Sequence, residues 1–473
     1  MSIAYNPSLQ CQLPIILALF QGGLLVVFIL YVDYDDQTSS LPLSNSTLPK
    51  DNQLYEIFPF FKDINVMLFI GLGLMLSFLK LYSFGGVAFN FLIANFSIQW
   101  SLVVQGFFNH YEDGRIKLGL ENVLNAEFAA VTAMISAGAI LGRVSPIQLL
   151  ILCLLEIPLY VVNDWLIHKY FHIIDVGGTV AIHVFSCYFG LGISRIFYHP
   201  ELRVGHTKET TTPNSDLLSL VGTLFLWIFW PSFNSVVAKA GNAQHRAVLN
   251  TFLALSASTL TTFAMSSLLS KKGQISLVHL QNATLAGGVA IAISADMIIT
   301  PGGALGLGCL ASISCILGFQ YLSPLMARRL KVQDQCGIHN LHGLPGIIGT
   351  LGSIIAVLFS PIDISDLSLN DDLYYTNGLK EGSSALEALG SNGTWNSRDQ
   401  AMGQAAALGV TFGISLLGGY MTGLLLKIPC LVHPSYEFYF DDQPYFQIKD
   451  ISENNWNSKD KHDRNLLMPL KEV

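Results

Sequence analysis

The chain alternates long apolar runs with short polar stretches. Runs of about 20 residues are the length that a helix needs to cross the roughly 30 Å hydrocarbon core of a bilayer. Membrane β-barrels show shorter segments in which apolar and polar residues alternate. The pattern therefore predicts an all-α integral membrane protein with about twelve transmembrane helices. The runs fall near residues 13–32, 64–82, 87–108, 122–142, 147–163, 176–198, 217–237, 247–269, 277–297, 302–325, 338–359 and 404–426.

Two short patterns recur within these runs. Residues 175–183 (DVGGTVAIH) and 334–342 (DQCGIHNLH) share D-x-x-G-x-x-x-x-H at an offset of 159, and NAEFAA at 125–130 is echoed by NATLAG at 282–287. Chance similarity is the alternative, but the two offsets nearly coincide. Each half then holds five spans, and an odd number places the halves in opposite orientations. We expect a five-plus-five inverted repeat, a transporter architecture, with halves at about 64–198 and 217–359.

The repeat puts His183 and His342 at equivalent positions inside apolar runs. An ionisable side chain inside a bilayer is costly and normally faces a cavity or a partner. A single buried histidine would more often be a hydrogen-bonded core residue, but two related by an inverted repeat should meet near its axis. Adjacent imidazoles in a dry site should stay neutral. They would then offer one donor and one acceptor to a small polar solute such as ammonia.

Three acidic residues accompany the histidines. Asp175 and Asp334 precede them by eight residues, near glycines, and Glu127 lies early in the fourth run. Capping of a helix start is at least as good an explanation of the two aspartates as contact with a substrate is, and it is the favoured explanation of Glu127. Asp175 could also attract cations. Both interpretations stay open from the sequence.

The segment GTLFLWIFWPSFNS at 222–235 is strongly aromatic. It is either a core- or lipid-facing helix bent at Pro231, or the wall of a vestibule. Trp230 and Phe233 stand three residues apart on one face, where an aromatic ring could attract a cation. A phenylalanine ring could also form a dry constriction that excludes ions.

The composition excludes several functional classes. Only 12% of residues are charged and 51% are hydrophobic, whereas about a quarter of a soluble domain is charged. No basic stripe supports nucleic-acid binding. The seven cysteines lie mostly in or beside apolar runs without a CxxC pair, as small buried hydrophobes do. No nucleophile–base or metal-ligand spacing appears, so we expect neither an enzyme nor a cofactor or metal.

Glycosylation signals and charge predict the orientation. The sequons at Asn45 and Asn392 lie in polar loops separated by an even number of spans, hence on one face, which glycosylation would place outside. Short loops on the other face are basic, as the positive-inside rule expects. Both termini should therefore be cytoplasmic. These basic residues are Lys80, Arg143, Arg195, Lys271, Lys272, Arg328, Arg329 and Lys331.

Two regions of different composition follow one another along the chain. Residues 1–430 should form the membrane domain, and its first run lacks a cleavage signature, so we expect it to be retained. Residues 431–473 are polar and charged, with few aromatic residues after Tyr445. Much of this cytoplasmic tail should be loosely ordered.

The runs DVGGTVAIH, FGLGISRI, GTLFLWIFWPSFNS, VHLQNATLAGGVA and CGIHNLHGLPGIIG resemble the Rh glycoproteins, relatives of the Amt ammonium transporters. The resemblance extends from about residue 10 to 430. In addition, YFDDQ at 439–443 looks like the tail of red-cell Rh proteins, and AMGQAAALG near 402 is similar to the Rh-associated glycoprotein.

The resemblance implies one pore per subunit in a homotrimer, or in a heterotrimer with other Rh members, at the plasma membrane. It implies that His183 and His342 are twin pore histidines, and that Phe128 and Phe233 are stacked gate residues. Asp175 and Trp230 match vestibule positions. Bacterial relatives place a serine four residues past the second gate residue, where this chain has Val237. A high-affinity ammonium site is therefore not expected.

Two functions remain open from the sequence. The first is a channel-type transporter that passes ammonia without net charge, with membrane lipid as its surroundings. The second is a non-conducting or CO₂-permeable scaffold subunit of an Rh complex, which could bind a cytoskeletal adaptor through its tail. The retained histidines and phenylalanines favour conduction.

Overall fold

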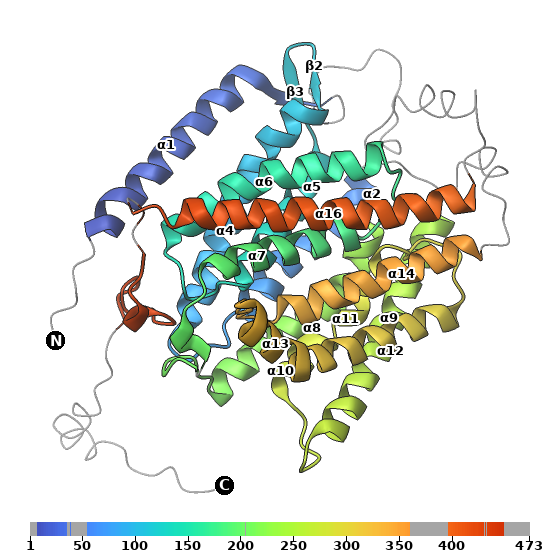
Figure 1. Ribbon diagram of the computed structural model, residues 1–473. Coiled ribbons are helices and arrows are strands. Elements are labelled where there is room, and N and C mark those ends of the chain that lie inside the picture. The colour runs from blue at the N-terminus through green and yellow to red at the C-terminus, as the bar shows by residue number, and fades with distance from the viewer. Residues whose placement is uncertain are drawn as a thin grey trace, which may run out of the picture.

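The computed structural model describes residues 7–35, 38, 54–203, 205–359, 396–429, 431 and 433–448. Most of the described residues are helical, and the long helices lie roughly side by side (Figure 1). The predicted glycosylation sites Asn45 and Asn392 lie outside the described residues. The helices of the first half are α1 (Pro7–Tyr31), α2 (Leu54–Asn65) with η2 (Val66–Leu72) and α3 (Gly73–Met75), α4 (Ser83–Asn109), α5 (Leu120–Gly138), α6 (Pro146–Lys169), η3 (Thr179–Val184) and α7 (Phe185–Ile196).

The remaining helices repeat this order and add one long helix at the end. The elements are α8 (Pro213–Ser235), α9 (Asn242–Leu269), α10 (Leu277–Ala283), α11 (Ala286–Ala292), α12 (Pro301–Leu317) with η5 (Gly318–Leu322), α13 (Ser323–Leu325) and η6 (Met326–Leu330), then η7 (His339–Gly343), α14 (Leu344–Leu358) and α16 (Ser397–Leu426).

Each of the twelve predicted apolar runs contains a helix, although residues 76–82 and 139–142, at the ends of two runs, are not helical. Ten of these helical segments are long and apolar enough to cross a membrane. The other two are α5, which carries two glutamates, and the pair α10 and α11, which is broken near Thr284. Some helices begin earlier than predicted: α2 starts at Leu54 because Lys62 and Asp63 interrupt its apolar run without ending the helix.

The inverted repeat is visible in the spacing of the helices. Leu54 and Pro213, which begin α2 and α8, are 159 residues apart, and so are Ser83 and Asn242, which begin α4 and α9. The same offset separates the two histidines. The fold is therefore the predicted all-α membrane architecture with two five-span halves.

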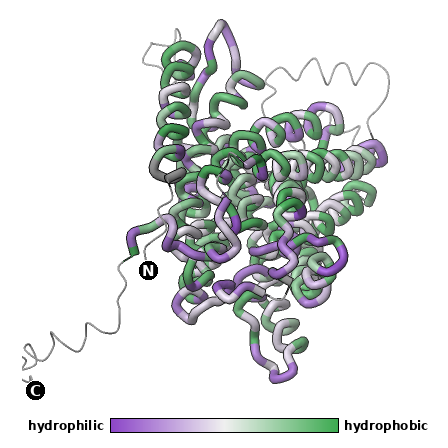
Figure 2. Tube along the Cα trace, turned by 60° about the vertical axis from the view of Figure 1, so that its left-hand side comes forward, coloured by the Kyte–Doolittle hydropathy of each residue, from purple (hydrophilic) through white to green (hydrophobic). Residues whose placement is uncertain are grey.

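The outward faces of the helices are apolar. Helix α1 lies along the side of the bundle (Figure 1), and Leu19 and Ile29 on it are 72% and 66% exposed. Figure 2 shows hydrophobic residues along the helices and hydrophilic residues mainly at their ends and in the loops. A water-soluble protein rarely exposes so much contiguous apolar surface, whereas lipid makes such a surface favourable.

Different structures mark the two ends of the bundle. At one end, which we call the strand end, β1 (Val32–Tyr34) pairs in parallel with β3 (Arg115–Leu118), and β2 (Tyr111–Glu112) pairs antiparallel with β3. At the other end, which we call the tail end, residues 433–448 fold back onto the helices (Figure 1).

The tail predicted from about Leu431 therefore begins with a packed segment. The amide of Phe440 donates to the Gly142 carbonyl at 2.9 Å, and the Phe440 side chain is fully buried. The Asp442 carboxylate accepts from the Phe84 and Gly85 amides at 2.8 and 2.7 Å. It thus caps the first turn of α4 from more than 350 residues away.

Arg143 lies in a short loop between α5 and α6, as predicted, but its side chain is buried. It is 1% exposed, and Nη2 donates to the carbonyls of Ala139 and Gln333 and to the hydroxyl of Ser194. The loop between α5 and α6 packs beneath the docked tail segment, so Arg143 instead satisfies carbonyl groups near the helix ends.

We expect Asp442→Ala to release the tail segment from the tail end. Loss of a helix cap costs about 0.5–2 kcal/mol, enough to raise the opened fraction several-fold. Hydrogen exchange of the Phe84, Gly85 and Phe440 amides should accelerate, with the transmembrane helices still protected. Glu437→Ala removes an exposed acid from the same segment and should leave exchange unchanged. Equal acceleration in both variants would contradict the capping role.

Candidate functional site

Two π-helical turns bring the predicted histidines together. His183 lies on η3 and His342 on η7, each just before an α-helix. Their Nδ1 atoms are 3.1 Å apart, and the rings are within 18° of parallel. Both side chains are buried, at 2% and 5% exposure. One Nδ1 must donate and the other accept, so the rings have opposite roles in this bond.

The acids of the repeated motif hold these turns. One Asp175 oxygen accepts from the amides of Val180 and Ala181, both at 2.8 Å. Asp334 accepts from the amides of Gly337 and Ile338 at 3.0 Å and from His339 at 2.8 Å. The capping alternative is thus observed for both acids. Asp175 keeps its second oxygen, Oδ1, buried and without a hydrogen-bond partner.

The spacing that the two copies of the motif share has a conformational reason. Gly178 and Gly337, three residues after each aspartate, have φ of +72° and +75°. These values lie in the left-handed region that glycine adopts without steric cost. Each glycine reverses the chain between the aspartate and the turn that it caps. The two glycines therefore explain why both halves keep the D-x-x-G pattern.

Aromatic rings close the site toward the strand end. The rings of Phe128 on α5 and Phe233 on α8 meet edge to face at 4.9 Å between centroids. Phe233 is 6.1 Å from the His183 ring, and Trp230 stacks on that ring at 5.8 Å. The two phenylalanines therefore lie together beside His183, but as an edge-to-face pair and not as the stacked pair that the resemblance implies. Both rings are buried and line the cavity around the histidines, so this face of α8 is turned to the interior and not to lipid.

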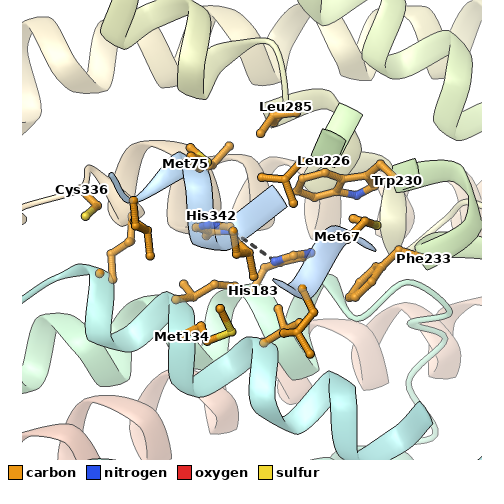
Figure 3. A pocket seen from close by; sticks show the side chains of 18 of the residues that line it. Met67, Met75, Met134, His183, Leu226, Trp230, Phe233, Leu285, Cys336 and His342 are labelled. Atoms are coloured by element: carbon orange, nitrogen blue, oxygen red, sulfur yellow. Dashed lines mark hydrogen bonds between the residues drawn. The ribbon is translucent and has the colours of Figure 1, made fainter. Parts of the chain in front are cut away.

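A cavity of about 50 Å³ surrounds the histidines, several times the 10–15 Å³ that one water molecule requires. Figure 3 shows Phe233 and Trp230 toward one side of the histidine pair and Cys336 toward the other. Apart from the imidazoles, the side chains around it are almost all apolar. Among the lining residues are Met67, Leu68, Met75, Met134, Leu226, Leu285, Ile338 and Leu341.

A few unpaired polar atoms lie in or beside this apolar cavity. His183 Nε2, Asn282 Oδ1 and Trp230 Nε1 are buried without a hydrogen-bond partner, and all three residues line the cavity. An unpaired buried polar atom costs about 1–3 kcal/mol. These atoms are therefore sites at which a small solute with both donor and acceptor groups gains hydrogen bonds.

Some predicted residues have other surroundings. Glu127 is 1% exposed, with Oε2 unpaired, and it does not line the cavity. The favoured prediction that it caps the start of its helix is wrong, because α5 begins at Leu120 and Glu127 lies beyond the first turn. Val237 is half-buried against neighbouring apolar residues just beyond α8. No hydroxyl group occupies that position.

Sequence reasoning missed most of the wall. Met67, Met75 and Met134 line the cavity, but an apolar residue facing a cavity has the same sequence signal as one facing lipid. Asn282 could have been found from the sequence, because it is the first residue of NATLAG, the echo of NAEFAA in the second half, and it lies in an apolar run.

The site is poorly suited to a metal. In the described ranges, no group of three or more His, Cys, Asp or Glu side chains lies close enough to hold an ion. Two imidazoles bound to each other would leave half of a tetrahedral site empty. The geometry instead suits a neutral solute that fits a dry passage and exchanges hydrogen bonds with the imidazoles.

Comparison with known proteins agrees with this geometry. The sequence model of the Ammonium Transporter Family matches residues 23–438. The chain belongs to the ammonium transporter family. The relatives of this family member include ammonium transporter Rh type C of Xenopus laevis, 40% identical over 95% of this chain and 93% of the relative. Ammonium transporter Rh type B of Danio rerio is also 40% identical, over 100% of this chain and 99% of the relative.

Solved structures of this family share the fold. Rh50 of Nitrosomonas europaea, described with the Rhesus protein family of channels, has a TM-score of 0.70 and 28% identity, covering 88% of this chain and 97% of that one. Mep2 of Saccharomyces cerevisiae is 20% identical and has a TM-score of 0.64; the match covers 89% of this chain and 98% of Mep2. The likeness to Mep2 concerns the fold alone.

We expect Gly288→Val in this ammonium transporter family member to displace Trp230. A Cβ at Gly288 would lie 2.8 Å from the indole ring, closer than packed atoms approach. The ring must then move and disturb its stack on His183. The change should appear as a shifted tryptophan emission spectrum and a lower flux in vesicles. Gly23→Val on α1 is the control, because nothing lies within 4 Å of a Cβ there and the change in helix propensity is the same. It should change neither the emission spectrum nor the flux. Normal emission and flux in Gly288→Val would refute the tight packing.

Proposed function

We propose that this chain is a channel-type transporter of ammonia and ammonium, with a passage through each subunit. The names of its Rh-type relatives support the substrate class. The observation that carries the proposal is the 3.1 Å contact between the Nδ1 atoms of His183 and His342 within an apolar cavity. Such a pair supplies a donor and an acceptor along a path that is otherwise dry.

The apolar side chains of the cavity wall favour a permeating species without charge. Stripping water from an ion inside a protein costs several kcal/mol even after relaxation. The cavity has no described ion pair to offset that cost, because the described ion pairs are Asp164–His168 and Lys208–Asp441. Neutral ammonia avoids most of the penalty and can both donate and accept hydrogen bonds. We therefore propose that net transport is electroneutral.

The strand end is the proposed recruiting side. Asp175 keeps one buried oxygen unpaired, and the face of Trp230 can attract a cation. Ammonium would be drawn toward this end, release its proton to the water on that side of the membrane, and continue as ammonia past the edge-to-face pair Phe128–Phe233. The absence of a hydroxyl side chain at Val237 argues against tight cation capture and for facilitated diffusion.

The cellular setting is proposed from the resemblance and the charge pattern. We infer a homotrimer, or a heterotrimer with other Rh members, in the plasma membrane with cytoplasmic termini. The tail could carry a cytoskeletal adaptor. Apolar outward faces, such as that of α1, leave room for contact with lipid and other subunits. The tail resemblance favours the alternative, a non-conducting scaffold, whereas the contact between His183 and His342 and the pair Phe128–Phe233 beside it support conduction.

We expect the double variant His183→Leu/His342→Leu to lower ammonia flux about tenfold or more. Each ring supplies a hydrogen bond worth about 1 kcal/mol, and 1.4 kcal/mol corresponds to a factor of ten in rate. The measurement is internal pH of proteoliposomes after an ammonium step, at matched protein content. Leucine keeps the cavity apolar and filled. Unchanged flux in well-inserted double variant would refute the assignment of the passage.

A further inference from the structure

A buried carboxyl group outside the transport path lies near the middle of α6. Glu156 is 0% exposed, and its helix packs against α4, α5 and α16. It does not line the cavity. A carboxyl group at this depth in a membrane protein is costly, so its hydrogen bonds and its charge require an explanation.

The hydrogen bonds around Glu156 can be counted. Glu156 Oε1 lies 2.6 Å from Ser136 Oγ on α5, and the same Oγ lies 2.8 Å from the Ser186 carbonyl oxygen on α7. A serine hydroxyl has a single hydrogen, and a carbonyl oxygen can only accept. If Ser136 donates to Ser186, the hydrogen between Ser136 and Glu156 must come from the carboxyl group. Each contact has a hydrogen of its own only when Glu156 is protonated; otherwise the two contacts share the single hydrogen of Ser136.

The charges around Glu156 lead to the same result. Neither described ion pair involves Glu156. Helix α4 has no charged residue, α5 has only acids (Glu121 and Glu127), the charged residue of α7 is Arg195 in its last turn, and those of α16 lie in its first turn. Glu156 Oε2 has no partner. An unpaired neutral oxygen is far less costly than an unpaired carboxylate.

The chain of contacts continues to the turn that carries His183. The Ser186 hydroxyl donates to the His183 carbonyl at 3.2 Å. Helices α5 and α7 touch directly here, because a Cβ at Gly190 would lie 2.7 Å from the Ser136 carbonyl oxygen. Ser136 therefore stands at a fixed distance from the end of the π-helical turn η3. Any loss of its partner Glu156 would be transmitted to this turn.

We propose that Glu156 keeps its proton in the folded protein and is a positioning residue, which holds His183 through Ser136 and Ser186. The role in transport rests on the proposed function of His183 in the passage. The proton on Glu156 does not depend on that function. The two parts are therefore tested by separate measurements.

Infrared difference spectroscopy of purified protein in vesicles at neutral pH tests the proton. When the spectrum of Glu156→Gln is subtracted from that of the wild-type protein, the difference should contain one band of a protonated carboxylic acid and no carboxylate band. Glu112→Gln, at an exposed glutamate, is the matched control and should lose a carboxylate band. Ser136→Ala should shift the Glu156 band, since its acceptor is removed; this keeps the test decisive if Glu156→Gln folds poorly. A lost carboxylate band in Glu156→Gln, or an unshifted band in Ser136→Ala, would overturn the proposal.

Flux in the same vesicles tests the positioning role. Glutamine keeps a donor for Ser136, so Glu156→Gln should keep normal flux. Glu156→Leu and Ser136→Ala should each lower flux about fivefold, the rate equivalent of one hydrogen bond. Because both act through one chain of contacts, the double variant should be no slower than either single one. The positioning role would be overturned if the flux losses of Glu156→Leu and Ser136→Ala multiplied in the double variant. Equal flux losses in Glu156→Gln and Glu156→Leu would also overturn it. Failure of the His183→Leu/His342→Leu test would leave the infrared result standing.

Discussion

A polar group inside a bilayer has no water to bind, so its partner must come from the protein or from the solute. His183 and His342 meet this requirement by binding each other through one nitrogen each. The second nitrogen of His183 remains unpaired in an apolar cavity. The arrangement is therefore stable without a solute and still has a position at which a small molecule gains a hydrogen bond.

The inverted repeat is what makes this pairing possible. Each half supplies the same unit: an aspartate, a glycine with positive φ, and a π-helical turn that ends near a histidine. Because the halves are oppositely oriented, the two units approach from opposite ends of the bundle. The remaining side chains of the wall, such as Met67 and Leu226, only need to be apolar and of suitable size. Buried groups outside the passage, such as Arg143 and Glu156, keep these units in register.

The sequence was sufficient for the parts that have a repeated or periodic signal. The helices followed from apolar runs, and the meeting of His183 with His342 followed from the 159-residue offset. The pairing of Phe128 with Phe233 came only from family resemblance, since neither spacing nor polarity marks Phe128. The burial of Arg143 and the docking of Asp442 onto α4 could not be predicted, because a cap supplied from a distant segment leaves no local pattern.

The most direct test of the account is an electrical one. The chain is reconstituted into vesicles on a solid-supported membrane, and ammonium is stepped while charge movement and internal pH are recorded together. A neutral passage predicts internal alkalinisation that depends on His183, without a sustained current at any protein density. A sustained ammonium current that scales with protein density and disappears in His183→Leu would contradict the account, because charge would then cross the apolar cavity with the substrate.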